Sequence, residues 1–289
     1  MKTIEKAPAK INLSLDVLGK RPDGYHEVEM VMTSVDLSDR IECQELSEDI
    51  IVIRSSAPFV PEDERNLAYQ AAQVIKDRYQ IKKGVRIDIL KEIPVAAGLA
   101  GGSSDAAAVI RALNRLWKLS LSREDMMEIG ALIGSDVPFC VIGGTALAKG
   151  RGEKLEVLPA PPPCWVVLAK PSVSISTADT YQALRLEGAP HPDVRGMVKA
   201  IEGRDYQKLC HKLGNILETV TLAKVSDVDQ IKTHMVQMGA DGVLMSGSGP
   251  TVFGLTQYES RMHRLYNSLK GYCPYVYGVR LLGVPNLLE

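Results

Sequence analysis

The sequence is poor in aromatic residues and has no long hydrophobic run. Aromatic residues make up 5% of the 289 positions, with ten Tyr, three Phe and two Trp. We therefore expect a core built mainly from aliphatic side chains. No apolar run reaches the roughly 18 residues that a transmembrane helix requires. Residues 1–10 lack the apolar segment typical of a signal peptide. We expect a cytoplasmic chain with no membrane partner.

Cysteine pairs and an excess of basic residues are also missing. The five cysteines are odd in number, widely spread and free of any CxxC pair, which disfavours a disulfide framework and a structural zinc site. Lys plus Arg total 34 against 35 Asp plus Glu, so the formal net charge is -1. Proteins that bind nucleic acids usually carry a basic excess. The charge balance therefore disfavours a nucleic-acid partner, but it is compatible with a few basic residues at an anionic small molecule.

Residues 159–163 mark the clearest division of the chain. They read Pro-Ala-Pro-Pro-Pro, which is too stiff for a helix or a central strand. We predict domains at 1–160 and 161–289. Hydrophobic periodicity predicts strands in the first half, over residues 7–18, 28–35, 40–46, 50–55, 84–93 and 139–142. Helices and strands alternate in the second half, with one helix expected over 206–220, so the fold class is α+β.

The strand predicted over residues 7–18 carries a polar face. Ile11 and Leu13 alternate with Lys10 and Asn12, a pattern typical of a half-buried strand. Lys10 and Asn12 therefore lie on the same face. Without other information, the pattern favours an ordinary solvated lysine at position 10.

A glycine-rich loop follows the strand predicted over 84–93. Gly98, Gly101 and Gly102 allow the backbone to approach an anion, and Ser103 and Ser104 add hydroxyl donors. The helix that follows directs its free N–H groups and the positive end of its dipole toward the same place, which favours phosphate. The spacing matches neither GxGxxG nor the Walker motif. The alternative is a glycine-rich helix entry that simply packs tightly.

Two further segments are candidates for chemistry. Asp136 lies in a Gly-Ser-Asp-Val-Pro stretch, where a turn or cap aspartate is the alternative reading. Tyr25 and His26 follow an Asp-Gly turn and could stack on a flat ligand, although a packed hairpin turn has the same sequence pattern. Asn66 is placed to cap a helix. The remaining histidines show no metal-ligand spacing, so no metal ligand is identified.

Taken in order, these segments resemble the three motifs of the GHMP small-molecule kinases. The motifs read Pro-Ala-Lys-Ile-Asn-Leu at 8–13, Pro-x-x-x-Gly-Leu-x-Gly-Gly-Ser-Ser at 94–104 and Met-Ser-Gly-Ser-Gly-Pro-Thr-Val-Phe at 245–253. Within that superfamily, Arg-Pro-Asp-Gly-Tyr-His at 21–26 and Gly-Ser-Asp-Val-Pro-Phe at 134–139 are similar to the 4-diphosphocytidyl-2-C-methyl-D-erythritol kinase family of the non-mevalonate isoprenoid pathway. The resemblance extends over nearly the whole chain.

The resemblance implies a two-domain GHMP kinase fold and an ATP-dependent kinase. The N-terminal domain would be ribosomal-protein-like α/β, the C-terminal domain ferredoxin-like, and the active site would lie between them. ATP would phosphorylate the 2-hydroxyl of a cytidine diphosphate alcohol, with Mg²⁺ expected, in a monomer or a homodimer.

The resemblance also assigns roles to individual residues. Lys10 and Asp136 would be catalytic. The implied substrate contacts are Asn12, Tyr25, His26 and Tyr181. The implied ATP contacts are Asn66, Pro94, Val95, Ala96, Ala97, Gly98, Leu99, Ala100, Gly101, Gly102, Ser103 and Ser104.

The sequence fits two other kinds of function less well. Mevalonate kinase, diphosphomevalonate decarboxylase and homoserine kinase belong to the same superfamily, but a nucleobase clamp at Tyr25 and His26 has no use in them. A ribosomal-protein-like module that binds RNA without catalysis belongs to another class, and the net charge of -1 disfavours it.

Overall fold

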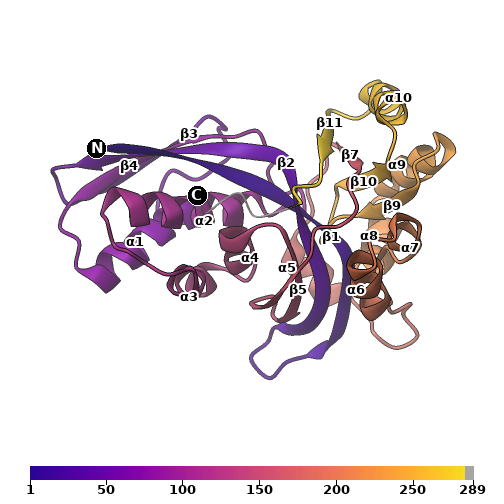
Figure 1. Cartoon of the computed structure of the whole chain (residues 1–289), viewed down its shortest axis with the longest axis horizontal. Coiled ribbons are helices and arrows are strands. Elements are labelled where there is room, and N and C mark those ends of the chain that lie inside the picture. Colours follow the sequence, from indigo (N-terminus) through magenta and orange to yellow (C-terminus); the bar gives the residue numbers. More distant parts are fainter. Residues whose placement is uncertain (284–289) are drawn as a thin grey trace.

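The first sheet is built around two long antiparallel strands. The computed structural model describes residues 1–283 (Figure 1). β1 (Lys2–Lys20) pairs along its length with β2 (His26–Leu46), so the strands predicted at 28–35 and 40–46 are one element. β4 (Gly84–Leu90) and β5 (Thr145–Gly150) pair with different halves of β2. This seven-stranded sheet is completed by β3 (Ile51–Ser55), β6 (Lys154–Leu158) and β8 (Gly214–Asn215).

Four helices pack in the first half, on one side of its sheet (Figure 1). They are α1 (Leu67–Tyr79), α2 (Gly101–Leu116), α3 (Arg123–Ile133) and α4 (Val137–Ile142). The Asn66 side chain accepts a hydrogen bond from the N–H of Ala68, which confirms the predicted cap. In residues 1–283, no helix is both long and apolar enough to cross a bilayer.

The second half forms a separate four-stranded sheet in the order β11-β7-β10-β9. Its strands are β7 (Trp165–Lys170), β9 (Gly242–Met245), β10 (Val252–Thr256) and β11 (Tyr275–Arg280). Its helices are α5 (Thr177–Ala183), α6 (Val194–Glu202), α7 (Tyr206–His211), α8 (Glu218–Lys224), α9 (Ser226–Gln237) and α10 (Glu259–Lys270). The sheets change at residues 159–163, yet β8 returns to pair with β1. The division between residues 160 and 161 stays a prediction.

β1 lies between two hydrophobic cores. Ile11 and Leu13 belong to a cluster with Phe253 of β10, whereas Leu15 and Val17 belong to the core that includes the helices of the first half. The polar face of the strand is buried as well, with Asn12 fully inaccessible. The prediction of a half-buried strand was therefore wrong: the second sheet covers the apolar face at Ile11 and Leu13, and on the polar face Asp136 approaches Lys10 while Met30 contacts Asn12.

Two other predicted elements differ in the structure. Residues 139–142 form the end of the short helix α4 rather than a strand. All six residues of α4 are buried, so its sequence shows neither the helical nor the alternating pattern that separates the two structures. The helix predicted over 206–220 is interrupted at Gly214 and Asn215, where β8 pairs with β1 and the Asn215 amide donates to the Met245 and Gly247 carbonyls.

We predict that Leu13→Ala lowers the free energy of unfolding by about 2–5 kcal/mol, because it opens a cavity in the core shared by both halves. Urea unfolding measures the change. Leu18→Ala is the matched control on the same strand, since Leu18 is 54% exposed, and it should change the free energy of unfolding by less than about 0.5 kcal/mol. Equal losses in the two variants would contradict the shared core.

Candidate active site

A cavity of about 750 Å³ lies where the two halves meet. Its wall includes Lys10 of β1, the loop that begins at Pro94, Asp136 before α4, and Tyr181 of α5. The second half also contributes Gly247 and Ser248, which precede β10. Residues far apart in the sequence therefore line one cavity of the size that holds small molecules and nucleotides.

The glycine-rich loop forms one wall of this cavity. α2 already begins at Gly101, so the amides of Gly101, Gly102 and Ser103 belong to its first turn, where N–H groups have no partner within the helix. Gly98 has a φ of +73°, and a Cβ there would lie 2.3 Å from the carbonyl oxygen of Ser246. Glycine is required at position 98 for both reasons. The wall is suited to an anion.

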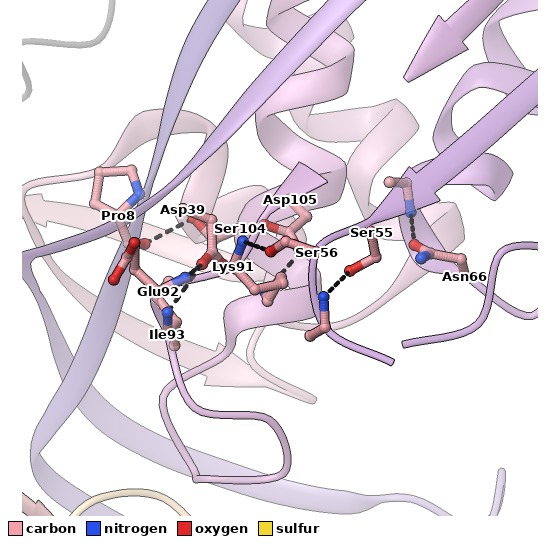
Figure 2. Close-up of polar contacts among 12 residues, drawn as sticks. Pro8, Asp39, Ser55, Ser56, Asn66, Lys91, Glu92, Ile93, Ser104 and Asp105 are labelled. Carbon is pink, nitrogen blue, oxygen red and sulfur yellow. Dashed lines mark hydrogen bonds and ion pairs between the residues drawn. The ribbon is translucent and has the colours of Figure 1, made fainter. Parts of the chain in front are cut away.

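Most of the predicted ATP contacts line the cavity, and two do not. Those that line it are Asn66, Pro94, Val95, Ala96, Ala97, Gly98, Ala100, Gly101, Gly102 and Ser103. Ser104 is fully buried, and its hydroxyl donates to the Pro8 carbonyl at 2.7 Å, as Figure 2 shows. Leu99 is 1% exposed, and its carbonyl accepts from the Lys10 N–H at 3.1 Å. In this structure these two residues connect the loop and α2 to β1.

Lys10 and Asp136 meet at the cavity wall. The Lys10 ammonium lies 3.5 Å from the Asp136 carboxylate and donates to the Asn12 side-chain oxygen at 2.7 Å. The Lys10 side chain is 6% exposed and that of Asp136 is 29% exposed, so the carboxylate has the more open position. Asn12 is fully buried, and its amide nitrogen faces Met30 Sδ. As a substrate contact, Asn12 stays a prediction.

The other end of the cavity is aromatic. The rings of His26 and Tyr181 lie 5.2 Å apart at a tilt of 42°, although 155 positions separate them in the sequence. The Arg151 guanidinium lies over the Tyr25 ring at 5.0 Å. Burial and the nearby Lys20 lower the pKa of His26. Its imidazole is therefore neutral at neutral pH, with one nitrogen that donates and one that accepts.

Sequence reasoning missed a buried ion cluster beside the glycine-rich loop. The Lys91 ammonium donates to Asp39 at 2.5 Å and to Asp105 at 2.8 Å (Figure 2). Asp39 also accepts from the N–H groups of Glu92 and Ile93. Lys91 and Asp105 both line the cavity. The one local sign of this cluster in the sequence is Asp105, an acidic residue directly before the three alanines of α2 at 106–108.

Asp39 and Asp105 share the Lys91 ammonium, and Asp105 accepts fewer hydrogen bonds than Asp39 does. Its Oδ1 atom is buried with no hydrogen-bond partner. Burial, which outweighs the attraction of Lys91, together with the Asp39 carboxylate raises the pKa of Asp105 to about 8. Burial opposes the charge of Lys91, but the two acids hold its pKa above the usual value.

Family models match both halves of the chain. The GHMP kinases N terminal domain matches residues 66–144, and the GHMP kinases C terminal domain matches residues 197–274. A curated protein of Bacillus subtilis named 4-diphosphocytidyl-2-C-methyl-D-erythritol kinase is 64% identical over 289 residues, which is 100% of both chains. The chain belongs to the 4-diphosphocytidyl-2-C-methyl-D-erythritol kinase family. A Geobacillus protein of the same name is 61% identical over 100% of both chains.

Solved structures agree with this family membership. A crystal structure of 4-(cytidine 5'-diphospho)-2C-methyl-D-erythritol kinase is 33% identical with a TM-score of 0.81, covering 96% of this chain and 99% of that one. A homoserine kinase from Cytophaga hutchinsonii has a TM-score of 0.79 at 19% identity, covering 98% and 95%. The second likeness shows the fold alone. The expected two-domain GHMP kinase fold is confirmed.

We predict that Asp105→Asn becomes more stable relative to the wild type as the pH rises. Burial raises the pKa of this carboxyl from 3.8 to about 8, so the folded state binds the proton more tightly than the unfolded state does. The wild type therefore loses stability through this group between pH 3.8 and about pH 8, whereas the amide does not titrate.

Urea unfolding of both proteins at about pH 5 and about pH 9 measures the difference. Asp77→Asn, which replaces an exposed carboxylate on α1, is the matched control and should show no comparable trend. Parallel stability curves for the wild type and Asp105→Asn would contradict the shared-cation interpretation.

Proposed function

We propose that the protein is an ATP-dependent kinase that phosphorylates the 2-hydroxyl of 4-diphosphocytidyl-2-C-methyl-D-erythritol. The observation that carries the proposal is the Lys10–Asp136 pair at 3.5 Å, in the wall of a cavity that also holds the glycine-rich loop and the His26–Tyr181 pair. A phosphate-binding wall, an acid–cation pair and an aromatic end are the three parts that this reaction needs. The named relatives support the same substrate.

Asp136 would orient the acceptor hydroxyl. An aspartate is too weak a base to deprotonate an alcohol outright, but phosphoryl transfer has a loose transition state. The hydroxyl oxygen bonds to the γ-phosphorus while the bond from that phosphorus to the bridging oxygen breaks, and ADP leaves. The hydroxyl proton becomes acidic as the new bond forms and passes to the Asp136 carboxylate.

Lys10 would act through the positive charge of its ammonium group. Its ammonium, 3.5 Å from Asp136, would hold in place the carboxylate that accepts the proton. The same positive charge would offset negative charge on the transferring phosphoryl group. Asn12 accepts one hydrogen from Lys10, which fixes the direction of the ammonium within the buried strand.

ATP would lie along the glycine-rich loop, with Mg²⁺ bound to its phosphates. Mg²⁺ prefers phosphate oxygens, carboxylates and water, and the cavity wall offers the Asp136 carboxylate and the Ser103 hydroxyl. Among residues 1–283, no group of three or more His, Cys, Asp and Glu is placed to hold a metal. We propose that the ion enters with ATP. Asn66, at the start of α1, would contact the nucleoside.

The aromatic end would hold cytosine. A neutral His26 offers both a donor and an acceptor, as the edge of cytosine requires, and the faces of Tyr25 and Tyr181 can stack on its ring. We place this reaction in the cytoplasm, as the sequence analysis expected.

We predict that Asp136→Asn lowers kcat by at least about 100-fold while ATP still binds, because the amide cannot accept the proton. A coupled ADP-release assay with the diphosphocytidyl substrate measures turnover, and a thermal shift with ATP measures binding. Asp229→Asn on α9, an exposed position, serves as control and should keep wild-type turnover. Near-normal kcat in Asp136→Asn would refute the proposed role.

We predict that His26→Ala raises the KM for the cytidine substrate about 10-fold or more and leaves the KM for ATP unchanged, because the loss is confined to base recognition. Steady-state kinetics with each substrate varied in turn measures both constants. His263→Ala, 62% exposed on α10, should alter neither. An unchanged KM for the cytidine substrate in His26→Ala would exclude the clamp.

A further inference from the structure

Arg111 is a buried cation that the catalytic scheme does not use. It lies in the middle of α2, is 3% exposed, and burial lowers its pKa to about 10, so it stays charged at neutral pH. A buried guanidinium is costly unless its donors are satisfied. The partners that satisfy it show what Arg111 does in the fold.

The hydrogen bonds of Arg111 reach two elements that carry catalytic residues. Nη2 donates to the Lys6 carbonyl at 2.9 Å, four residues before Lys10 on β1. Nη1 donates to the Cys140 carbonyl at 2.9 Å, in the short helix α4. The N–H of Cys140 in turn donates to the Asp136 carbonyl at 3.1 Å. Because a guanidinium is planar and rigid, its two Nη atoms hold the Lys6 and Cys140 carbonyl oxygens at a fixed separation.

We propose that Arg111 is a positioning residue, which sets the separation of Lys10 and Asp136 by binding the main chains of both elements that carry them. α4 has only six residues, and Asp136 at its start makes no side-chain cap hydrogen bond. The helix therefore has little stability of its own. The guanidinium supplies a fixed point from α2, and Ser104 on the same helix binds β1 at the Pro8 carbonyl.

The inference rests on the proposed kinase function for its kinetic test. Arg111→Met retains the length and apolar part of the side chain but removes the bonds to the Lys6 and Cys140 carbonyls, together with the contact to Glu5. We expect kcat to fall about 10- to 100-fold, because small misplacements of reacting groups are costly, with both KM values within about 2-fold of the wild type. Arg111→Lys, which can reach only one of the two carbonyls at a time, should have an intermediate kcat.

Arg115→Met is the matched control. Arg115 lies one turn further along α2 and, within residues 1–283, bonds to Glu5 and the Ile4 carbonyl on β1. It shares Glu5 with Arg111 but not the carbonyl in α4. We expect Arg115→Met to keep wild-type kcat even where its unfolding midpoint falls.

A double-mutant cycle separates positioning from general stability. In an Asp136→Asn background, Arg111→Met should cost less than about 3-fold in kcat, because the group that it positions is already lost. An equal fold loss in both backgrounds would overturn the proposal, and so would wild-type kcat in Arg111→Met.

Hydrogen exchange gives a readout that does not depend on activity. Backbone amides of residues 136–143 should exchange faster in Arg111→Met and at the wild-type rate in Arg115→Met. Unchanged exchange in Arg111→Met would overturn the positioning role. An inactive wild type with the expected exchange pattern would instead refute the proposed kinase function and leave the Arg111 inference standing.

Discussion

The ammonium of Lys10 is a charge inside a strand that is buried on both faces. An isolated charge in such a place is strongly unfavourable, so it needs an anion and well-aligned acceptors. Asn12 supplies an acceptor from the same strand, and Asp136 supplies the anion from the start of α4. The ammonium can therefore be buried only if α4 packs beside β1. Folding of the first half and assembly of the proposed catalytic pair are one requirement.

The same requirement occurs twice more around α2. Lys91 is held by Asp39 and by Asp105 of α2, and Arg111 of α2 is satisfied by β1 and α4. Lys91 and Arg111 thus connect α2 with the segment before the glycine-rich loop, with β1 and with α4, while Lys10 connects β1 with the start of α4. Each cation is held by partners from other elements, so these contacts depend on the complete arrangement.

Local features of the sequence were sufficient for some parts of this arrangement and insufficient for others. The cap at Asn66 was predicted because it depends on neighbouring residues alone. The Lys91 cluster was not, because its partners lie 52 and 14 positions away and no periodicity connects them. The proximity of Lys10 and Asp136 came from family resemblance. Composition also could not show that the polar face of β1 is buried, since Asp136, which approaches Lys10 on that face, lies far from it in the sequence.

The near-neutral charge of the chain agrees with the proposal that the site binds anions mainly through backbone groups. The Gly98 carbonyl accepts from the Ser246 hydroxyl, and the next carbonyl, of Leu99, accepts from the Lys10 N–H. In a trans peptide the N–H points opposite to the carbonyl. These two bonds therefore turn the amides of Leu99 and Ala100 away from Ser246 and from β1. One bond comes from each half of the chain, so the conformation of the glycine-rich loop depends on both halves being in place.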